Sequence, residues 1–296
     1  MNKLNVPETV VRIAPGDGAL PPIVVNAPHA TAEIYLHGAH VTHFQPTGAE
    51  PVLFVSGKSH FESGKAIRGG VPVIFPWFGP RSGDPSAPMH GFVRTADWEL
   101  IDAVATEEDV TVRFGFKSSE TTRKWLRNDF ELVYSVRVGR SLELSLEVRN
   151  RSASAFTFEE ALHSYLTVGD VRQVTIEGLS GKTYIDKTAA MARKTQSGPI
   201  RIEGETDRVY LNTADAVTVS DPTMNRRLII SKTGSQSTVV WNPWIDKAKA
   251  LPDFGDDEWP HMLCIETVNA ADNAITLPAG QSHVMSAIIG VATGAK

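Results

Sequence analysis

The segment Phe130–Val148, FELVYSVRVGRSLELSLEV, best indicates the fold, because apolar and polar residues alternate in it on both sides of a glycine. The apolar positions are spaced by two, and they are Leu132, Tyr134, Val136 and Val138, then Leu142, Leu144, Leu146 and Val148. This spacing places apolar side chains on one face of a β-strand. Gly139-Arg140 between the two runs predicts a short turn, so we expect a β-hairpin.

The same alternation recurs along the chain and predicts many strands. It is clear at Val110, Val112, Phe114 and Phe116. Further strands are predicted over Ala32–Leu36, Val41–Gln45, Val171–Glu177, Ala216–Ser220, Arg227–Lys232, Thr238–Trp241, Met262–Thr267 and Ser282–Val291. Helical signals are short: Ser119–Arg127 predicts two turns and Asp256–Trp259 one. Without a β-α rhythm, the sequence favours one large antiparallel sandwich, a single domain over residues 1–296.

Composition narrows the class of protein. Of 296 residues, 42% are hydrophobic and 21% charged, which is typical of a globular chain with a full core. A net charge of −5 disfavours nucleic-acid or anionic-membrane partners. Because no run has the length of a signal peptide or a membrane span, we expect a cytoplasmic protein. Cys264 is the single cysteine, which excludes an internal disulfide and a zinc cluster of several thiolates.

Two apparent cofactor motifs fail. Gly181-Lys182-Thr183 resembles the end of a phosphate-binding loop, but Ile176 stands where that loop needs its first glycine. His37, His40 and His43 are spaced by three, so on a strand neighbours face opposite sides and the outer two lie roughly 20 Å apart. The chain also has no serine-nucleophile elbow, dinucleotide loop or calcium loop. We therefore expect no cofactor and no metal.

Two segments supply cations. Arg68 precedes Gly69-Gly70 in a run punctuated by proline, and MHGFVR contains His90 and Arg94. Two converging guanidinium groups would suit a phosphate, whose oxygens they bind in bidentate geometry. A single arginine more often forms a surface ion pair, so both interpretations stay open.

Two other segments place an ionisable group among strand residues. His163 lies in EEALHSYL, and Glu266 interrupts the apolar run MLCIET. A buried carboxylate is costly unless it is paired or functional, so Glu266 is the sharper anomaly. A lone histidine there is more often a hydrogen-bonded scaffold residue than a catalyst. The adjacent Glu159 and Glu160 would point apart on a strand and are expected to be scaffold.

Together these segments resemble the glucose-6-phosphate 1-epimerases, the hexose-6-phosphate mutarotases of the aldose 1-epimerase superfamily. The motifs occur in order between about Ala32 and Gly290, and they are Arg68-Gly69-Gly70 with Phe75-Pro76, His90-Gly91 with Arg94, Leu162-His163-Ser164-Tyr165, Trp241-Asn242-Pro243-Trp244 and Cys264-Ile265-Glu266. The resemblance implies a galactose-mutarotase-like β-supersandwich of antiparallel strands with a few short helices, a core over about residues 32–290, and no metal. It also implies a histidine and a glutamate that face each other across the sugar.

The resemblance assigns roles residue by residue. It makes His163 and Glu266 the catalytic pair, and it places Arg68, Arg94 and Asp207 at substrate contacts, with His90 lining the same cleft. Met89 departs from the pattern, because a sugar-contacting glutamine can stand there in relatives. The aromatic residues Trp77, Phe78, Trp241 and Trp244 are as compatible with core as with sugar stacking.

Exchange of anomers needs a base for the C1 hydroxyl proton and an acid for the ring oxygen. The hypothesis is that ionised Glu266 is the base and protonated His163 the acid, acting on a hexose 6-phosphate in a monomeric enzyme. An epimerase for unphosphorylated aldoses and a non-catalytic sugar-phosphate-binding protein are the alternatives. A glycoside hydrolase is disfavoured, since it needs two facing carboxylates and Glu266 alone stands out.

Overall fold

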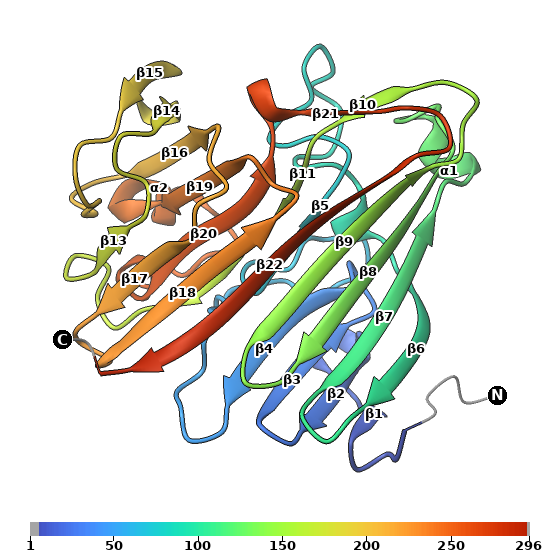
Figure 1. Cartoon of the computed structure of the whole chain (residues 1–296), viewed down its shortest axis with the longest axis horizontal. Coiled ribbons are helices and arrows are strands. Elements are labelled where there is room, and N and C mark those ends of the chain that lie inside the picture. The colour runs from blue at the N-terminus through green and yellow to red at the C-terminus, as the bar shows by residue number, and fades with distance from the viewer. Residues whose placement is uncertain (1–5, 295–296) are drawn as a thin grey trace.

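The computed structural model describes residues 6–294, whose regular structure is almost entirely antiparallel β-sheet (Figure 1). The predicted all-β class is therefore confirmed. The strands form two large sheets and two small ones, and short helices and turns connect them.

The first large sheet has eight strands in the order β13-β17-β18-β22-β9-β8-β7-β6. Their bounds are β6 Glu99–Ala105, β7 Val110–Lys117, β8 Phe130–Val138, β9 Leu142–Asn150, β13 Thr175–Glu177, β17 Val217–Asp221, β18 Arg226–Thr233 and β22 Ser282–Thr293. The predicted hairpin is confirmed, since β8 pairs with β9 and Val138 lies opposite Leu142. All eight of its predicted apolar side chains are buried, while Arg137 and Glu143 pair on the other face at 2.5 Å.

The second large sheet carries the chemistry described below. Its path is β15-β14-β16-β19-β20-β11-β5, with β12 also paired to β20. The bounds are β5 Val73–Ile74, β11 Glu160–Leu162, β12 Tyr165–Thr167, β14 Thr183–Asp186, β15 Ala192–Thr195, β16 Thr206–Leu211, β19 Ser237–Asn242 and β20 Met262–Asn269. Every residue of β19 and β20 is buried, as expected for central strands covered on both faces.

The two small sheets complete the layers. One has the order β1-β2-β3-β4 and the other pairs β10 with β21. The bounds are β1 Val11–Ile13, β2 Pro22–Ala27, β3 Ala30–Tyr35, β4 His40–Pro46, β10 Phe156–Phe158 and β21 Ile275–Leu277. Figure 1 shows the four-stranded sheet in blue behind β6 to β9, and β2 contacts β7 while β3 contacts β8. One connected cluster of buried apolar side chains runs through these layers.

The helices are short, and their predicted positions needed correction. Helix α1 spans only Glu120–Arg123, because its Ser119–Thr122 capping box starts a helix that ends one turn later. Residues 256–258 form a turn, and the 3₁₀ helix there is η4, Trp259–His261. Helix α2, Trp244–Ala250, was not predicted, although Pro243 and the lysine and alanine residues after it are a helix-start signal. The other 3₁₀ helices are η1 Asp17–Ala19, η2 Val93–Thr95, η3 Lys187–Ala189 and η5 Ala271–Asn273.

Two further expectations were partly wrong. Of the predicted strand Val171–Glu177, only β13 forms, because the Asp170 carboxylate accepts from the Arg172 backbone and folds the preceding residues into a turn. His37 lies between β3 and β4 rather than on a strand, so strand spacing does not apply to it. Its ring contacts Asp97 and the Lys65 carbonyl, which gives it a structural role.

A buried polar cluster joins the two large sheets. Glu160 of β11 is 0% exposed, and its Oε1 lies 3.0 Å from His283 Nε2 of β22 and accepts from the Asn269 amide of β20 at 2.9 Å. Burying a charged carboxylate costs solvation free energy, and the contacts with His283 and Asn269 compensate for this cost. Burial opposes protonation of His283, but Glu160 prevails and raises the pKa of the imidazole. Glu160 thus has a structural role, since its carboxylate links β11 to β20 and β22.

None of the helices in residues 6–294 combines the length and the apolar character needed to cross a bilayer.

The His283–Glu160 contact predicts a pH-dependent stability. Since the folded-state pKa of His283 is raised, its contribution is complete below the unfolded pKa near 6.5 and is lost as the pH rises through the folded value. We therefore expect His283→Gln to lower the free energy of unfolding more at pH 5.5 than at pH 9. Urea denaturation at both pH values measures this, with His29→Gln, which removes an exposed histidine beside Glu108, as the control. A pH-independent difference would contradict the prediction.

Candidate active site

All six residues predicted from the sequence to form the site line one cleft of about 470 Å³. They come from loops, from η2, from β16 and from β20, and they are Arg68, His90, Arg94, His163, Asp207 and Glu266. The volume lies within the usual range for pockets that hold small molecules. Residues separated by almost 200 positions therefore meet at one concave surface, which makes it the candidate active site.

The pairing of β20 with two short strands brings His163 and Glu266 together. Leu162 of β11 lies opposite Thr267, and Tyr165 of β12 lies opposite Cys264. The register is the same on both sides of the interruption, so His163 falls opposite Glu266. Their side chains meet with His163 Nε2 3.5 Å from Glu266 Oε1. The two groups are thus neighbours on one face of the sheet.

Both members of the pair are withdrawn from water. His163 is 6% exposed and Glu266 2% exposed. Burial lowers the pKa of His163 well below its usual value, and the positive charges of Arg94 and Arg68 lower it further. Burial raises the pKa of Glu266 well above its usual value; Lys187 opposes this shift, and Asp207 adds to it. In the empty cleft, both groups are therefore biased toward their neutral forms.

Aromatic rings fix the orientation of the imidazole. The ring of Tyr165 stacks on that of His163 with centroids 4.7 Å apart and planes 8° from parallel. Trp241 meets His163 edge-on at 6.2 Å, and the His90 ring lies 5.6 Å away. Because a stacked ring resists rotation, His163 is held with Nε2 toward Glu266.

The two cleft arginines differ in their partners. Arg68 donates to Asp253 Oδ1 and to the Tyr165 hydroxyl, each at 3.1 Å. Arg94 donates to the Met89 carbonyl at 2.9 Å, its Nε has no partner, and no carboxylate of residues 6–294 lies within ion-pair distance of it. Burial lowers the pKa of Arg94 to about 10. A partly buried guanidinium group without an ion-pair partner is electrostatically favourable for an anion.

Glycines allow the loops that carry these arginines to pack closely. A Cβ atom on Gly70, where φ is 59°, would lie 2.2 Å from the Val41 carbonyl oxygen. On Gly91, where φ is 72°, it would lie 1.9 Å from that of Phe75. Only glycine fits these positions without displacing the backbone. A glycine within three positions of each arginine therefore marks these two loops in the sequence.

Several cleft residues were missed by sequence reasoning. Lys187 of η3 lies 3.3 Å from Asp207 and 5.2 Å from the ring centre of Phe78. Lys247 of the unpredicted helix α2 lies 3.5 Å from Glu205. Nothing in the local sequence of either lysine marks it as part of a site.

The aromatic candidates divide into two groups. Phe78 and Trp241 line the cleft, as does Met89, which is half exposed. Trp77 instead packs against Phe92 and Trp125, and Trp244 packs against Trp259 with centroids 4.3 Å apart. Trp77 is therefore a core residue, and Trp244 is a partly buried residue that packs against the core; neither lines the cleft.

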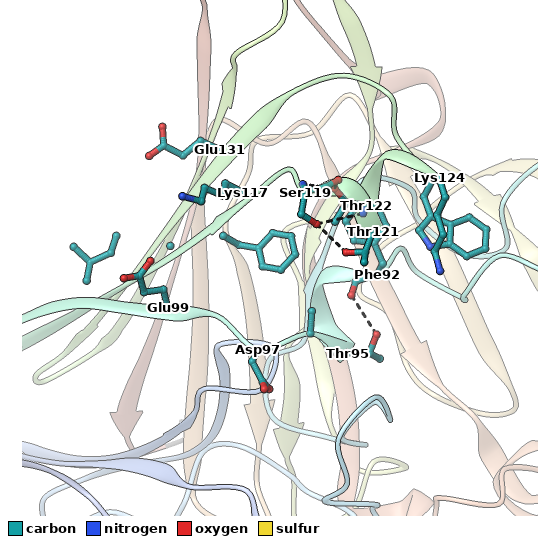
Figure 2. A pocket seen from close by; sticks show the side chains of 15 residues that line it. Phe92, Thr95, Asp97, Glu99, Lys117, Ser119, Thr121, Thr122, Lys124 and Glu131 are labelled. Atoms are coloured by element: carbon teal, nitrogen blue, oxygen red, sulfur yellow. Dashed lines mark hydrogen bonds between the residues drawn. The ribbon is translucent and has the colours of Figure 1, made fainter.

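A second cavity, of about 570 Å³, lies between β6, β7 and α1 (Figure 2). In Figure 2, the side chains of Glu99, Lys117 and Glu131 lie at the left, and Ser119 lies beside Thr121 and Thr122, to which it is hydrogen-bonded. None of the six predicted site residues lines this cavity, and Glu131 is engaged by Arg151. It offers no buried acid/base pair among its lining residues, so the cleft around His163 remains the candidate.

The family description for aldose 1-epimerase matches residues 22–289. A protein of Escherichia coli K12, named as a candidate glucose-6-phosphate 1-epimerase, is 35% identical over 267 residues, which cover 90% of this chain and 89% of that protein. A protein of Salmonella typhimurium with the same name is 36% identical over 84% of this chain and 83% of its own length.

Solved structures show the same fold. The crystal structure of a candidate mutarotase from Salmonella typhimurium superposes with a TM-score of 0.90 at 34% identity, covering 96% of this chain and 94% of that one. Galactose 1-epimerase from Lactobacillus acidophilus superposes with a TM-score of 0.74 at 13% identity, covering 96% of this chain and 99% of that one. The second likeness is one of fold alone, and it agrees with the predicted galactose-mutarotase-like sandwich.

The positive charge of Arg94 predicts a measurable effect on His163. Replacing Arg94 with Gln removes a charge that disfavours the imidazolium, so the pKa of His163 should rise toward 6.5 but stay below it, because burial remains. Imidazole nitrogen shifts followed by NMR across a pH titration report this change. Lys117→Gln, in the cavity of Figure 2, should leave the His163 titration unchanged. An unchanged titration in Arg94→Gln would show that this charge does not reach the imidazole.

Proposed function

The chain belongs to the aldose 1-epimerase family and interconverts the anomers of a sugar, and we propose that its substrate is a hexose 6-phosphate, with glucose 6-phosphate foremost. We further propose that His163 and Glu266 are its acid and base. The observation that carries the proposal is a buried histidine and glutamate 3.5 Å apart in a cleft that also holds an arginine without a counter-charge.

The spacing of the pair suits the two oxygens that exchange protons. The C1 hydroxyl oxygen and the ring oxygen of a pyranose are bonded to the same carbon, so they lie closer together than the two protein groups. Side by side on one face, Glu266 Oε1 and His163 Nε2 can therefore each address one of these oxygens. The acid and the base need not stand on opposite walls of the cleft.

The pair needs only one proton for this chemistry. A neutral imidazole with a neutral carboxyl group and an imidazolium with a carboxylate contain the same number of protons, and they differ by transfer of one proton across the 3.5 Å contact. Burial favours the neutral arrangement in the empty cleft. The proposed mechanism uses the charged arrangement, so the substrate must shift this balance.

A phosphate dianion supplies that shift. Arg94 and Arg68 hold down the pKa of His163, and a dianion beside them cancels their positive charge. Binding of a phosphorylated sugar would therefore favour protonated His163 beside ionised Glu266. In this proposal, the anchor of the substrate also prepares the catalytic pair, because the same charges act on both.

The two arginines have different tasks in the proposed complex. Arg94 lacks a carboxylate partner among the described residues, so a phosphate would compensate its charge. Arg68 is already held by Asp253 and by Tyr165, which suits it to orient one phosphate oxygen. Asp207 and His90 lie on the walls of the cleft, where they would accept or donate hydrogen bonds to sugar hydroxyls.

The proposed reaction opens and recloses the sugar ring. Glu266 takes the proton of the C1 hydroxyl while His163 delivers one to the ring oxygen, and the bond between C1 and that oxygen breaks to give an aldehyde. Rotation about the C1–C2 bond presents the other carbonyl face to the C5 hydroxyl. The reverse proton transfers close the ring as the other anomer, and the phosphate anchor keeps C1 near the pair throughout.

Substitutions in the pair test its role. His163→Ala and Glu266→Gln should each lower kcat/KM for anomer exchange by roughly 10²- to 10⁴-fold, the usual contribution of a positioned acid or base. NMR exchange spectroscopy between the anomers of glucose 6-phosphate measures the rate, and far-UV circular dichroism verifies folding. His261→Gln, which removes a histidine outside the cleft, should keep wild-type activity. If folded variants of the pair retained full activity, the acid/base assignment would fail.

Substitution of Arg94 tests the phosphorylated substrate. Arg94→Ala should raise KM for glucose 6-phosphate by roughly 10- to 100-fold, because a charge-assisted hydrogen bond to the phosphate is lost, and should change activity on free glucose little. Arg68→Ala should act in the same direction, and it is best combined with Asp253→Asn so that no carboxylate is left unpaired. Equal losses on both sugars would favour an unphosphorylated aldose. A wild type that accelerates neither sugar would favour a non-catalytic binding protein.

A further inference from the structure

Cys264 stands beside the proposed catalytic pair although the proposed reaction does not use it. It precedes Glu266 by two positions on β20, so the two side chains lie on the same face of that strand. One donor atom from each of His163, Cys264 and Glu266 lies within 4.8 Å of the other two. An imidazole nitrogen, a sulfur and a carboxylate oxygen are thus gathered at one point.

This donor set matches the preferences of zinc. Zinc binds imidazole nitrogen, thiolate sulfur and carboxylate oxygen in tetrahedral geometry, with ligand atoms roughly 3.3–3.6 Å from one another. The nitrogen of His163 and the oxygen of Glu266 already stand 3.5 Å apart. Small side-chain rotations would bring the sulfur of Cys264 to the same spacing. The fourth position would face the cleft that His163 and Glu266 line, open to water.

An unpartnered carboxylate oxygen gives a second, independent sign of a ligand. Glu266 Oε2 is buried and has no hydrogen-bond partner within residues 6–294. Leaving a buried carboxylate oxygen unpaired costs free energy that a bound cation would recover. Cys264 itself is 0% exposed, and its Sγ donates to Met262 Sδ at 3.7 Å.

We propose that His163, Cys264 and Glu266 form an inhibitory site for a thiophilic divalent cation such as Zn²⁺. Binding replaces the proton of the Cys264 thiol and that of the Glu266 carboxyl group by the metal, so two protons leave when the site is filled, and no oxidant or reductant takes part. The bound cation occupies the nitrogen and oxygen that the proposed reaction needs for proton transfer. Metal and sugar therefore exclude each other.

The site differs from a resident cofactor in its consequence. A catalytic zinc accelerates chemistry through bound water, whereas a cation here immobilises the acid and the base. Chelators should thus raise the activity of metal-exposed protein rather than abolish it. Only the inhibition readout of this proposal rests on the proposed function; metal binding can be observed without any sugar.

The first measurement is the absorption of Co²⁺ added to the purified chain. Co²⁺ replaces Zn²⁺ in tetrahedral sites, and a Co²⁺–thiolate bond gives a charge-transfer band in the near ultraviolet. The wild type should show this band, and Zn²⁺ should displace it. Cys264→Ala should lack it, and Cys264→Ser, which keeps the size of the side chain, is the second variant if the alanine protein is unstable. Absence of the band in wild type would overturn the proposal.

The second measurement is inhibition of anomer exchange by Zn²⁺. After treatment with a chelator, Cys264→Ala should exchange glucose 6-phosphate within about two-fold of wild type, because the sulfur takes no part in proton transfer. The Zn²⁺ concentration that halves activity should rise by roughly ten-fold or more in this variant. Equal inhibition of both proteins would overturn the role of Cys264.

The two measurements separate the two proposals. If chelator-treated wild type shows no anomer exchange but still gives the Co²⁺–thiolate band, the proposed function fails while the metal site stands. If exchange is normal and the band is missing, the metal site fails alone.

Discussion

The pairing of β20 with β11 and β12 brings an imidazole and a carboxyl group together where neither is solvated. Strand register is a strong constraint, because a slip by one residue would turn Glu266 to the other face of the sheet and away from His163. Burial then moves the pKa of each group toward its neutral form. A pair in this condition exchanges a proton readily when a nearby charge changes, and that property underlies both the proposed catalysis and the proposed metal site.

The rest of the fold maintains this register. The buried side chains of the β8–β9 hairpin belong to the same apolar core as those of the second large sheet, and β22 connects the two large sheets through His283. His283 contacts Glu160 on β11, three positions before His163, and Asn269 on β20, three positions after Glu266. The polar cluster therefore connects β20, which carries Glu266, with β11, which ends immediately before His163. Its partners compensate for a carboxylate that would otherwise be costly to bury.

The positive charges that line the cleft are all in ion pairs except that of Arg94. Arg68 pairs with Asp253, Lys187 with Asp207 and Lys247 with Glu205, but no carboxylate of the described residues forms an ion pair with Arg94. An anionic ligand would complete this arrangement, and its charge would act on His163 as well. In the proposed complex, the charges that bind the substrate are also the charges that set the pKa of His163.

The sequence by itself indicated the all-β class and many of the strands, and the resemblance of its motifs to a known family named the six candidate site residues. Alternation with a period of two is a local property, and motifs that carry glycine or an isolated acid in an apolar run remain visible without coordinates. Burial of all eight predicted hairpin residues, among them Tyr134 and Leu144, shows how reliable that pattern is. Short helices were less predictable, since α1 and α2 depend on capping and on packing rather than on a repeated pattern.

Only the tertiary structure decided which side chains meet. The partner of Arg68 is Asp253, the free cation is Arg94, and Lys187 enters the cleft from a segment without any local signal. Trp241 lines the cleft, while Trp244, three positions later, packs against Trp259 outside it. The reason is physical: pairing between distant strands sets distances, burial and electric fields, and none of these is a property of a single segment of the chain.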